Sequence, residues 1–195
     1  MSEEEPSGSS AKLTPARPWG PRGVCSRPVN TSNQSSQSKA EPRALGLWRR
    51  FGGNRIGRLA FSAGVWAKAP YFVTVVPVVR SAEPGRVVMS SPKWPGVHNH
   101  IGTFHAIAMC NIAEAAMGVL MEVTVQPSHQ WIPKGMAVDY LAKAPSSLTA
   151  TATIEPIDFG TISDGTDVVV TVSITDKNGN EVVNARITTW VRPKN

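Results

Sequence analysis

The chain has 195 residues, enough for one domain of common size and a tail, and 41% of them are hydrophobic. Its 20 Lys and Arg residues outnumber 14 Asp and Glu residues, which gives a net charge of +6. This balance suits an anionic partner. The sequence has no basic cluster with interleaved aromatic residues, so we do not expect that partner to be nucleic acid.

The two cysteines and the first residues bear on the compartment. Cys25 stands in a polar stretch and Cys110 in an apolar one, which favours free thiols in a reducing compartment over a disulfide framework. The chain opens with the acidic and polar stretch MSEEEPSGSS, which does not resemble a secretory signal. We therefore expect a cytoplasmic protein.

The N-terminal part divides into a tail and a helical segment. Residues 1–42 are dominated by Ser, Pro, Gly, Gln and Asn and are expected to be a disordered tail, so that the folded domain spans 43–195. Over 43–68 apolar residues recur at helical spacing. Gly52 and Gly53 interrupt this pattern, so it fits two short helices as well as one.

A hairpin and a long helix follow. The β-branched run of residues 71–80, the turn SAEPG and residues 86–90 are typical of a β-hairpin. Pro77 places its first strand at a sheet edge or a bulge. Residues 103–121 are almost all apolar, apart from Asn111 and Glu114, and these polar positions favour a buried core helix over a membrane span.

Four further strands are expected after this helix. Residues 136–144 are mixed, 148–154 and 167–175 alternate, and residues 181–191 follow the two-residue turn signal Asn178-Gly179. A helix without a polar face must be covered, and hairpin-linked strands make an antiparallel sheet. The pattern predicts an α+β domain in which a curved antiparallel sheet of five to six strands wraps around one central apolar helix.

One segment of the chain resembles a known active site. The run from Asn99 through Gly102, His105 and Ala106, with Glu114 nine residues after His105, is similar to that of hot-dog-fold acyl-CoA thioesterases of the phenylacetate-pathway (PaaI-like) type. The resemblance covers roughly residues 65 to 192, and the later stretch WIPKGMAVDYLAKA looks closer to an uncharacterised microbial branch. It implies a hot-dog fold and a homo-oligomer, either a dimer or a dimer of dimers.

The resemblance also implies a catalytic set. Glu114 would serve as the base or as the nucleophile, the amide of Ala106 would hold the thioester oxygen, and Asn99 would position water or the carbonyl. An ionised carboxylate in apolar surroundings is costly without a role, and we expect Glu114 to be half-buried. A structural Glu114 and an Asn99 that only closes a turn stay open as alternatives.

The remaining expectations concern substrate binding. The predicted substrate-binding residues are Gly102, His105, Ile107 and Lys134, with a coenzyme A thioester as substrate and neither a cofactor nor a metal. The histidines at 98, 100 and 105 match no standard zinc spacing, and Cys110 is expected in the core. The sequence does not give the acyl chain length. Whether a tunnel leads past the methionines at 109, 117 and 121 would distinguish long acyl chains from short ones.

Two features depart from the family pattern. Where the family has His-Gly-Gly, this chain has His105-Ala106-Ile107. Where some relatives have a hydroxyl residue that assists the reaction, this chain has Pro133-Lys134. These departures keep open a non-catalytic acyl-CoA or lipid-binding hot-dog protein. A hot-dog hydratase is less favoured, because the Asp/His dyad of such enzymes is not visible in the sequence.

Overall fold

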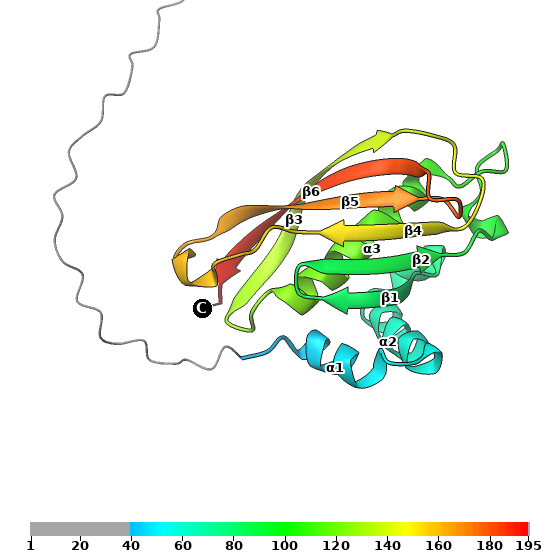
Figure 1. Ribbon diagram of the computed structural model, residues 1–195. Helices are drawn as coiled ribbons and strands as arrows, with labels where there is room; N and C mark the ends of the chain where they lie inside the picture. Colours follow the sequence, from blue (N-terminus) through cyan, green and yellow to red (C-terminus); the bar gives the residue numbers. More distant parts are fainter. Residues whose placement is uncertain (1–39, 195) are drawn as a thin grey trace, which may run out of the picture. The chain divides into compact units, whose positions relative to one another are not determined.

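The computed structural model describes residues 40–194, so most of the predicted tail, together with Cys25, lies outside the described residues. The α-helices of this part are α1 (Arg43–Phe51), α2 (Arg55–Lys68) and α3 (Ala106–Thr124) (Figure 1). Its strands are β1 (Val78–Glu83), β2 (Arg86–Ser91), β3 (His129–Tyr140), β4 (Leu148–Thr153), β5 (Thr166–Thr175) and β6 (Glu181–Pro193).

The six strands form one sheet that covers the central helix α3. Their order is β1-β2-β4-β5-β6-β3, and every neighbouring pair is antiparallel. The sheet curves over α3, which contacts strands along its whole width (Figure 1). This arrangement confirms the predicted α+β architecture, with six strands around one helix.

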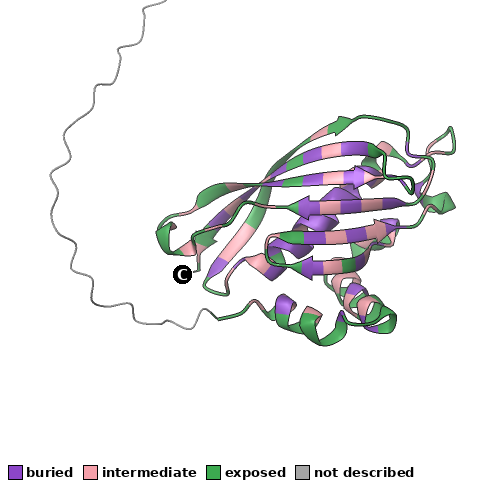
Figure 2. Cartoon of the chain, viewed as in Figure 1, coloured by how far each residue is buried: buried purple, intermediate pink, exposed green. Residues whose placement is uncertain are grey.

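The core lies between the inner face of the sheet and α3. Buried and less buried residues alternate along the strands (Figure 2), as the pleat requires. Fully buried residues of the core include Ala150, Ala152, Val172, Ile174 and Ala185 from the sheet and Ile112, Met117, Leu120 and Met121 from α3. Each large apolar side chain among them contributes roughly 1.5–3 kcal/mol by leaving water.

The helix α3 is not covered on all sides. Ile107, Glu114 and Glu122 are exposed and Gly118 is half-buried, and their spacings of seven, four and four residues place them on one stripe. We call these four residues the open stripe of α3. By length and hydropathy α3 is the one helix among residues 40–194 that could cross a membrane, and most of it is buried inside the domain.

The segment before the sheet forms two helices. Asn54 caps α2 by accepting a hydrogen bond of 2.8 Å from the N–H of Gly57. A Cβ atom at Gly57 would lie 1.8 Å from the carbonyl oxygen of Phe51, so glycine permits the close approach of α1 and α2. The buried hydroxyl of Ser62 accepts from the N–H of Val79 at 3.0 Å and thereby fixes α2 to β1.

Two expected strands differ in the structure. Pro70–Val75 is a 3₁₀-helix (η1) instead of a strand, because Pro70 opens it at a position where a missing N–H is tolerated. Val76 then turns with a φ of 44°, and β1 begins after Pro77 at a sheet edge, as predicted. Strand β3 begins at His129 instead of near Met136, because a bulge between Pro133 and Gly135 accommodates the proline.

The β5–β6 turn has three residues instead of the predicted two. The N–H of Asp176 donates to the carbonyl of Asn180 at 2.9 Å, and Gly179 takes the left-handed conformation, with a φ of 85°. The Asp176 carboxylate accepts from the Asn180 amide at 3.1 Å and from the N–H of Asn178 at 2.8 Å. The hydrogen bond from the Asn180 side chain has the largest effect, and together these bonds hold the pKa of Asp176 below its ordinary value.

We expect Asp176→Ala to lower the melting temperature at neutral pH, because it leaves turn N–H groups without their acceptor. Since the folded-state pKa is lowered, the stabilisation is present above the unfolded pKa of about 3.9 and is lost as the pH falls through the folded value. Circular dichroism melts between neutral and acid pH measure this difference. Lys177→Ala, in the same turn, is the control, and an equal melting temperature for both variants would contradict the role of Asp176.

Candidate active site

The loop that leads into α3 is held by the side chain of Asn99. Its Oδ1 accepts from the N–H groups of Ile101 at 3.1 Å and Thr103 at 3.0 Å, and its Nδ2 donates to Thr103 Oγ1 at 2.8 Å. Gly102 has a φ of 75°, which the turn requires and glycine adopts without strain. Asn99 therefore closes this turn, which is the structural alternative that the sequence left open.

The first turn of α3 offers a free amide. His105 Nδ1 accepts from the N–H of Ile107 at 3.1 Å, the hydrogen bond of an N-cap. The N–H of Ala106, the first helical residue, has no hydrogen-bond partner within residues 40–194. It points out of the positive end of the helix dipole. This N–H can therefore donate to a negatively charged oxygen.

A cavity of about 360 Å³ lies beside this first turn. Its lining includes Thr74, His98, His105 and Ile107, together with the buried Asn111. Asn111 Nδ2 donates to Thr74 Oγ1 at 2.8 Å, while its Oδ1 has no partner in the described part of the chain. The cavity thus has a buried acceptor in its wall. The sequence showed Asn111 only as a polar interruption of an apolar run.

Glu114 lies on the open stripe and is exposed, so the expectation of a half-buried carboxylate is wrong for a single chain. The sheet covers the opposite side of the helix, and the neighbours Ala113 and Ala115 are fully buried instead. Glu114 follows Asn111 by three residues, about 4.5 Å along the axis. It is therefore accessible to water beside the wall of the first cavity.

A larger cavity of about 680 Å³ lies between α1, α2 and α3. Its wall is mostly apolar and includes Leu47, Phe51, Phe61, Val65, Ala115 and Gly118. At its rim Lys68 Nζ forms an ion pair of 3.3 Å with Glu122. The methionines at 109, 117 and 121 are buried in the core and do not line this cavity, which lies beside another face of α3.

Tyr140, at the end of β3, reaches the same helix. Its Oη lies 3.0 Å from Cys110 Sγ and donates to the carbonyl of Ala106 at 3.4 Å. Cys110 is therefore half-buried beside the candidate site instead of lying in the core. Sequence reasoning missed Tyr140, because a contact between residues 30 positions apart has no local signal.

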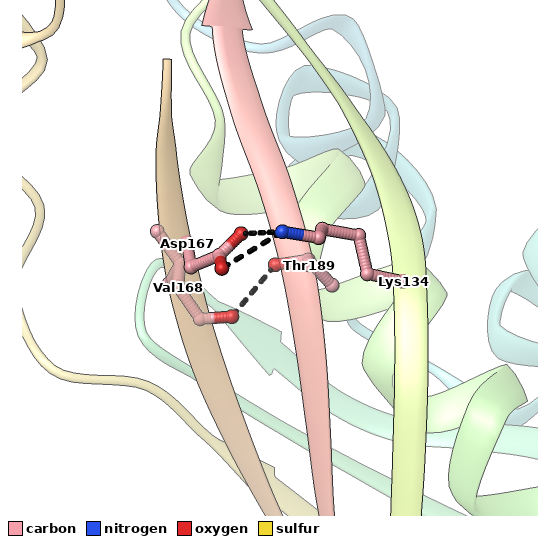
Figure 3. Close-up of polar contacts among 4 residues, drawn as sticks. All are labelled: Lys134, Asp167, Val168 and Thr189. Carbon is pink, nitrogen blue, oxygen red and sulfur yellow. Dashed lines mark hydrogen bonds and ion pairs between the residues drawn. The ribbon is translucent and has the colours of Figure 1, made fainter.

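Lys134 is not brought to this site (Figure 3). Its Nζ reaches the Asp167 carboxylate, at 2.8 and 2.9 Å from the two oxygens, and lies 5.0 Å from the centre of the Trp190 ring. Asp167 alternates with the inward-facing Val168 and Val170, so this ion pair stands on the outer face of the sheet. The predicted contact of Lys134 with the substrate has no support in this geometry.

The loop histidines do not gather around a common point. His105 Nδ1 is occupied by the N–H of Ile107, and His98 and His100 are both exposed on the loop. Within residues 40–194 no three His, Cys, Asp or Glu side chains are placed to hold a metal ion. Metal-free chemistry stays a prediction.

We expect the phenol of Tyr140 to titrate well above the ordinary range, because its hydrogen bond to Cys110 and its partial burial raise its pKa from 10.0 to about 12. The ultraviolet difference between the wild type and Tyr140→Phe, followed from pH 9 to about pH 13, isolates this group. Cys110→Ala should move its midpoint back toward the ordinary value. A wild-type midpoint near that value would show that the bond is not formed.

Comparisons with known proteins agree with this geometry. Residues 57–191 match the family described as a domain of unknown function, DUF4442. The structural-genomics protein APC5556 is 34% identical, with a TM-score of 0.66 over 77% of this chain and 99% of its own. No curated protein matches the chain.

More distant structures share the fold. A probable thioesterase of Pseudomonas aeruginosa is 20% identical, with a TM-score of 0.61 over 67% of this chain and 91% of its own. A thioesterase of Haemophilus influenzae is 12% identical, with a TM-score of 0.60 over 69% and 90%. The chain belongs to the DUF4442 family and has the hot-dog fold of these thioesterases.

Proposed function

We propose that the protein hydrolyses acyl-CoA thioesters, with Glu114 as the base or the nucleophile and the Ala106 N–H as the oxyanion donor. The observation that carries the proposal is the unpartnered N–H of Ala106 at the start of α3, on the same helix as the water-accessible Glu114. The thioesterase names of the structural neighbours support the reaction class. Gly102, His105 and Asn99 shape the loop that presents the amide.

The proposed reaction needs these two groups and water. In the base route Glu114 accepts a proton from water while the water oxygen bonds to the thioester carbon. The carbonyl oxygen becomes negative and is held by the Ala106 N–H. The carbon–sulfur bond then breaks, and the proton passes to the coenzyme A thiolate. In the nucleophilic route the Glu114 carboxylate bonds to the thioester carbon, and the carbon–sulfur bond breaks with release of the coenzyme A thiolate. Water then hydrolyses the resulting anhydride, which frees the acid and Glu114, and a proton from this water passes to the thiolate.

The distance between the two groups favours a site shared between two chains. Ala106 and Glu114 are eight residues apart, which is about 12 Å along a helix axis. One carbonyl group is too small to meet both within one chain. We therefore propose a homodimer in which Glu114 of one chain faces the α3 start of its mate. The edge strand β3, with Ile132, Met136 and Tyr140 exposed, is the proposed contact surface.

The larger cavity is the proposed site of the acyl chain. Its wall begins at Ala115, the residue after Glu114, and continues through Gly118 into the space below α1 and α2. A mostly apolar wall with few polar groups suits an aliphatic chain. We therefore expect aliphatic acyl groups to be preferred over small polar ones.

One observation favours a non-catalytic acyl-CoA-binding protein as the second candidate. Ile107, which stands where the family has its second glycine, is 59% exposed on the first turn of α3, and its side chain crowds the approach to the Ala106 amide. Tight binding of acyl-CoA without turnover at any chain length would favour this candidate over hydrolysis.

We expect Ala106→Pro to lower kcat/KM by about 100–1,000-fold, because proline removes the N–H that holds the oxyanion. Proline is well tolerated at the first helical position, and His105, with φ −71° and ψ 140°, already has the backbone that precedes a proline. The measurement is acyl-CoA hydrolysis over a range of chain lengths. Ala106→Gly keeps the N–H and is the matched control.

Glu114→Gln tests the carboxylate in the same assay and should lose at least as much activity, because the amide can neither take a proton from water nor attack the carbonyl. Glu155→Gln, at an exposed site between β4 and β5, is its control. Hydrolysis at the wild-type rate by Ala106→Pro or Glu114→Gln would contradict the proposed role of that residue.

A mixed dimer tests the shared site. In a dimer of one Ala106→Pro chain and one Glu114→Gln chain, the site that combines the intact Glu114 of the first with the intact Ala106 of the second is complete. We expect purified mixed dimers to regain about half of the wild-type activity, since one of their two sites is whole. An unfractionated co-expression should regain about a quarter, because random pairing makes about half of the dimers mixed. If each site were built within one chain, the mixed dimer would be as inactive as its parents.

A further inference from the structure

The two N-terminal helices carry most of the net charge of the chain. Residues 41–68 hold six basic residues and one acid, a net charge of +5 within a total of +6. Glu41 pairs with Arg49, and Lys68 pairs with Glu122. Within residues 40–194 Arg43, Arg50 and Arg55 form no salt bridge.

Large apolar side chains stand exposed among these charges. Ile56 is 84% exposed, Leu47 and Leu59 are each 51% exposed, and Phe51 is 40% exposed. We call these four residues, with the exposed Arg43, Arg49, Arg50 and Arg55, the α1–α2 face. Arg58 is half-buried, and its Nε donates to the carbonyl of Gly52 at 2.9 Å. The inner side of the same helices is occupied by the core, because Leu45 and Ser62 are buried. Both helices are therefore amphipathic and have a basic outer surface.

We infer that the α1–α2 face binds the surface of an anionic membrane. Amphipathic helices that combine Leu, Phe or Trp with Lys and Arg lie in the plane of the lipid headgroups, where apolar side chains enter the acyl boundary and basic ones meet anionic lipids. The face offers both kinds of contact. The protein is thereby attached from one side and needs no spanning segment.

Charge argues against a second copy of the chain as the occupant. A two-fold contact through this face would bring the same patch of both copies together, so that the exposed arginines of one copy would meet the same arginines of the other. Nucleic acid would satisfy the charge but leave the four apolar side chains in water. An anionic lipid surface satisfies both, which is why we commit to it.

The face also borders the larger cavity. Leu47 and Phe51 line that cavity and belong to the α1–α2 face, so a docked protein would hold the cavity close to the lipids. The inference does not rest on the proposed hydrolysis, because it follows from the charge and exposure of α1 and α2 alone.

Vesicle co-sedimentation of the full-length chain tests the inference. We expect binding to vesicles of phosphatidylcholine mixed with phosphatidylglycerol at low salt, weaker binding when salt is added, and none to phosphatidylcholine alone. Removing two charges with Arg50→Gln and Arg55→Gln should weaken partition by about 30-fold. Lys177→Gln with Arg186→Gln, which removes two exposed charges elsewhere, is the matched control and should weaken it much less.

A second variant tests the apolar contact. Ile56→Ser with Leu59→Ser should abolish vesicle binding while leaving the far-ultraviolet circular dichroism and the oligomeric state in sedimentation velocity unchanged. Three results would overturn the inference. The first is no binding to anionic vesicles at low salt, and the second is a loss of vesicle binding in the Lys177/Arg186 control equal to that in the Arg50/Arg55 variant. The third is a serine variant that dissociates the oligomer and still binds vesicles. The last result would assign the face to a second copy.

Discussion

The close approach of α3 to the sheet rests on small side chains. Ala150, Ala152 and Ala185 line the inner face of the sheet, and Ala113 and Ala116 stand on α3, all fully buried. Larger residues at these positions would push helix and sheet apart and leave their neighbours underpacked. Because α3 lies so close, all six strands of the curved sheet reach it. The contact fixes which side of α3 is buried and which side stays open.

The same contact decides where chemistry can occur. The sheet occupies one side of α3, and the hydrogen bond between Ser62 and Val79 holds α2 against β1. Within residues 40–194 the open stripe carries the exposed side chains of α3. Glu114 lies on that stripe, next to Ala115 in the wall of the larger cavity and three residues after Asn111 in the wall of the smaller one. The buried helix also aims its first amide, that of Ala106, at the loop that Asn99 closes. A rigid core thereby supplies the fixed dipole that oxyanion stabilisation requires.

The periodicity of apolar residues in the sequence predicted those helices and strands that turn one side toward the core. Strands β4, β5 and β6 and helix α3 follow their patterns, and the family segment located Ala106 and Glu114. The hydrophobic pattern could not show which side of α3 stays open, because the residues around Glu114 are apolar on all sides. It also could not show that the β-branched run after Pro70 forms a 3₁₀-helix. The partners of Asn111, Tyr140 and Lys134 lie 30 or more residues away, and only the folded chain brings them together.

The two edges of the sheet have a consequence for self-assembly. At one edge, β3 is interrupted by Pro133, which has no N–H to donate, and by the bulge before Gly135. At the other edge, β1 carries a bulge between Val79 and Ser81. A strand from another chain can form regular hydrogen bonds with β3 only beyond the bulge, toward Tyr140. The bulge in β1 prevents regular pairing along the full length of that strand. Edge-to-edge growth into fibrils is therefore disfavoured.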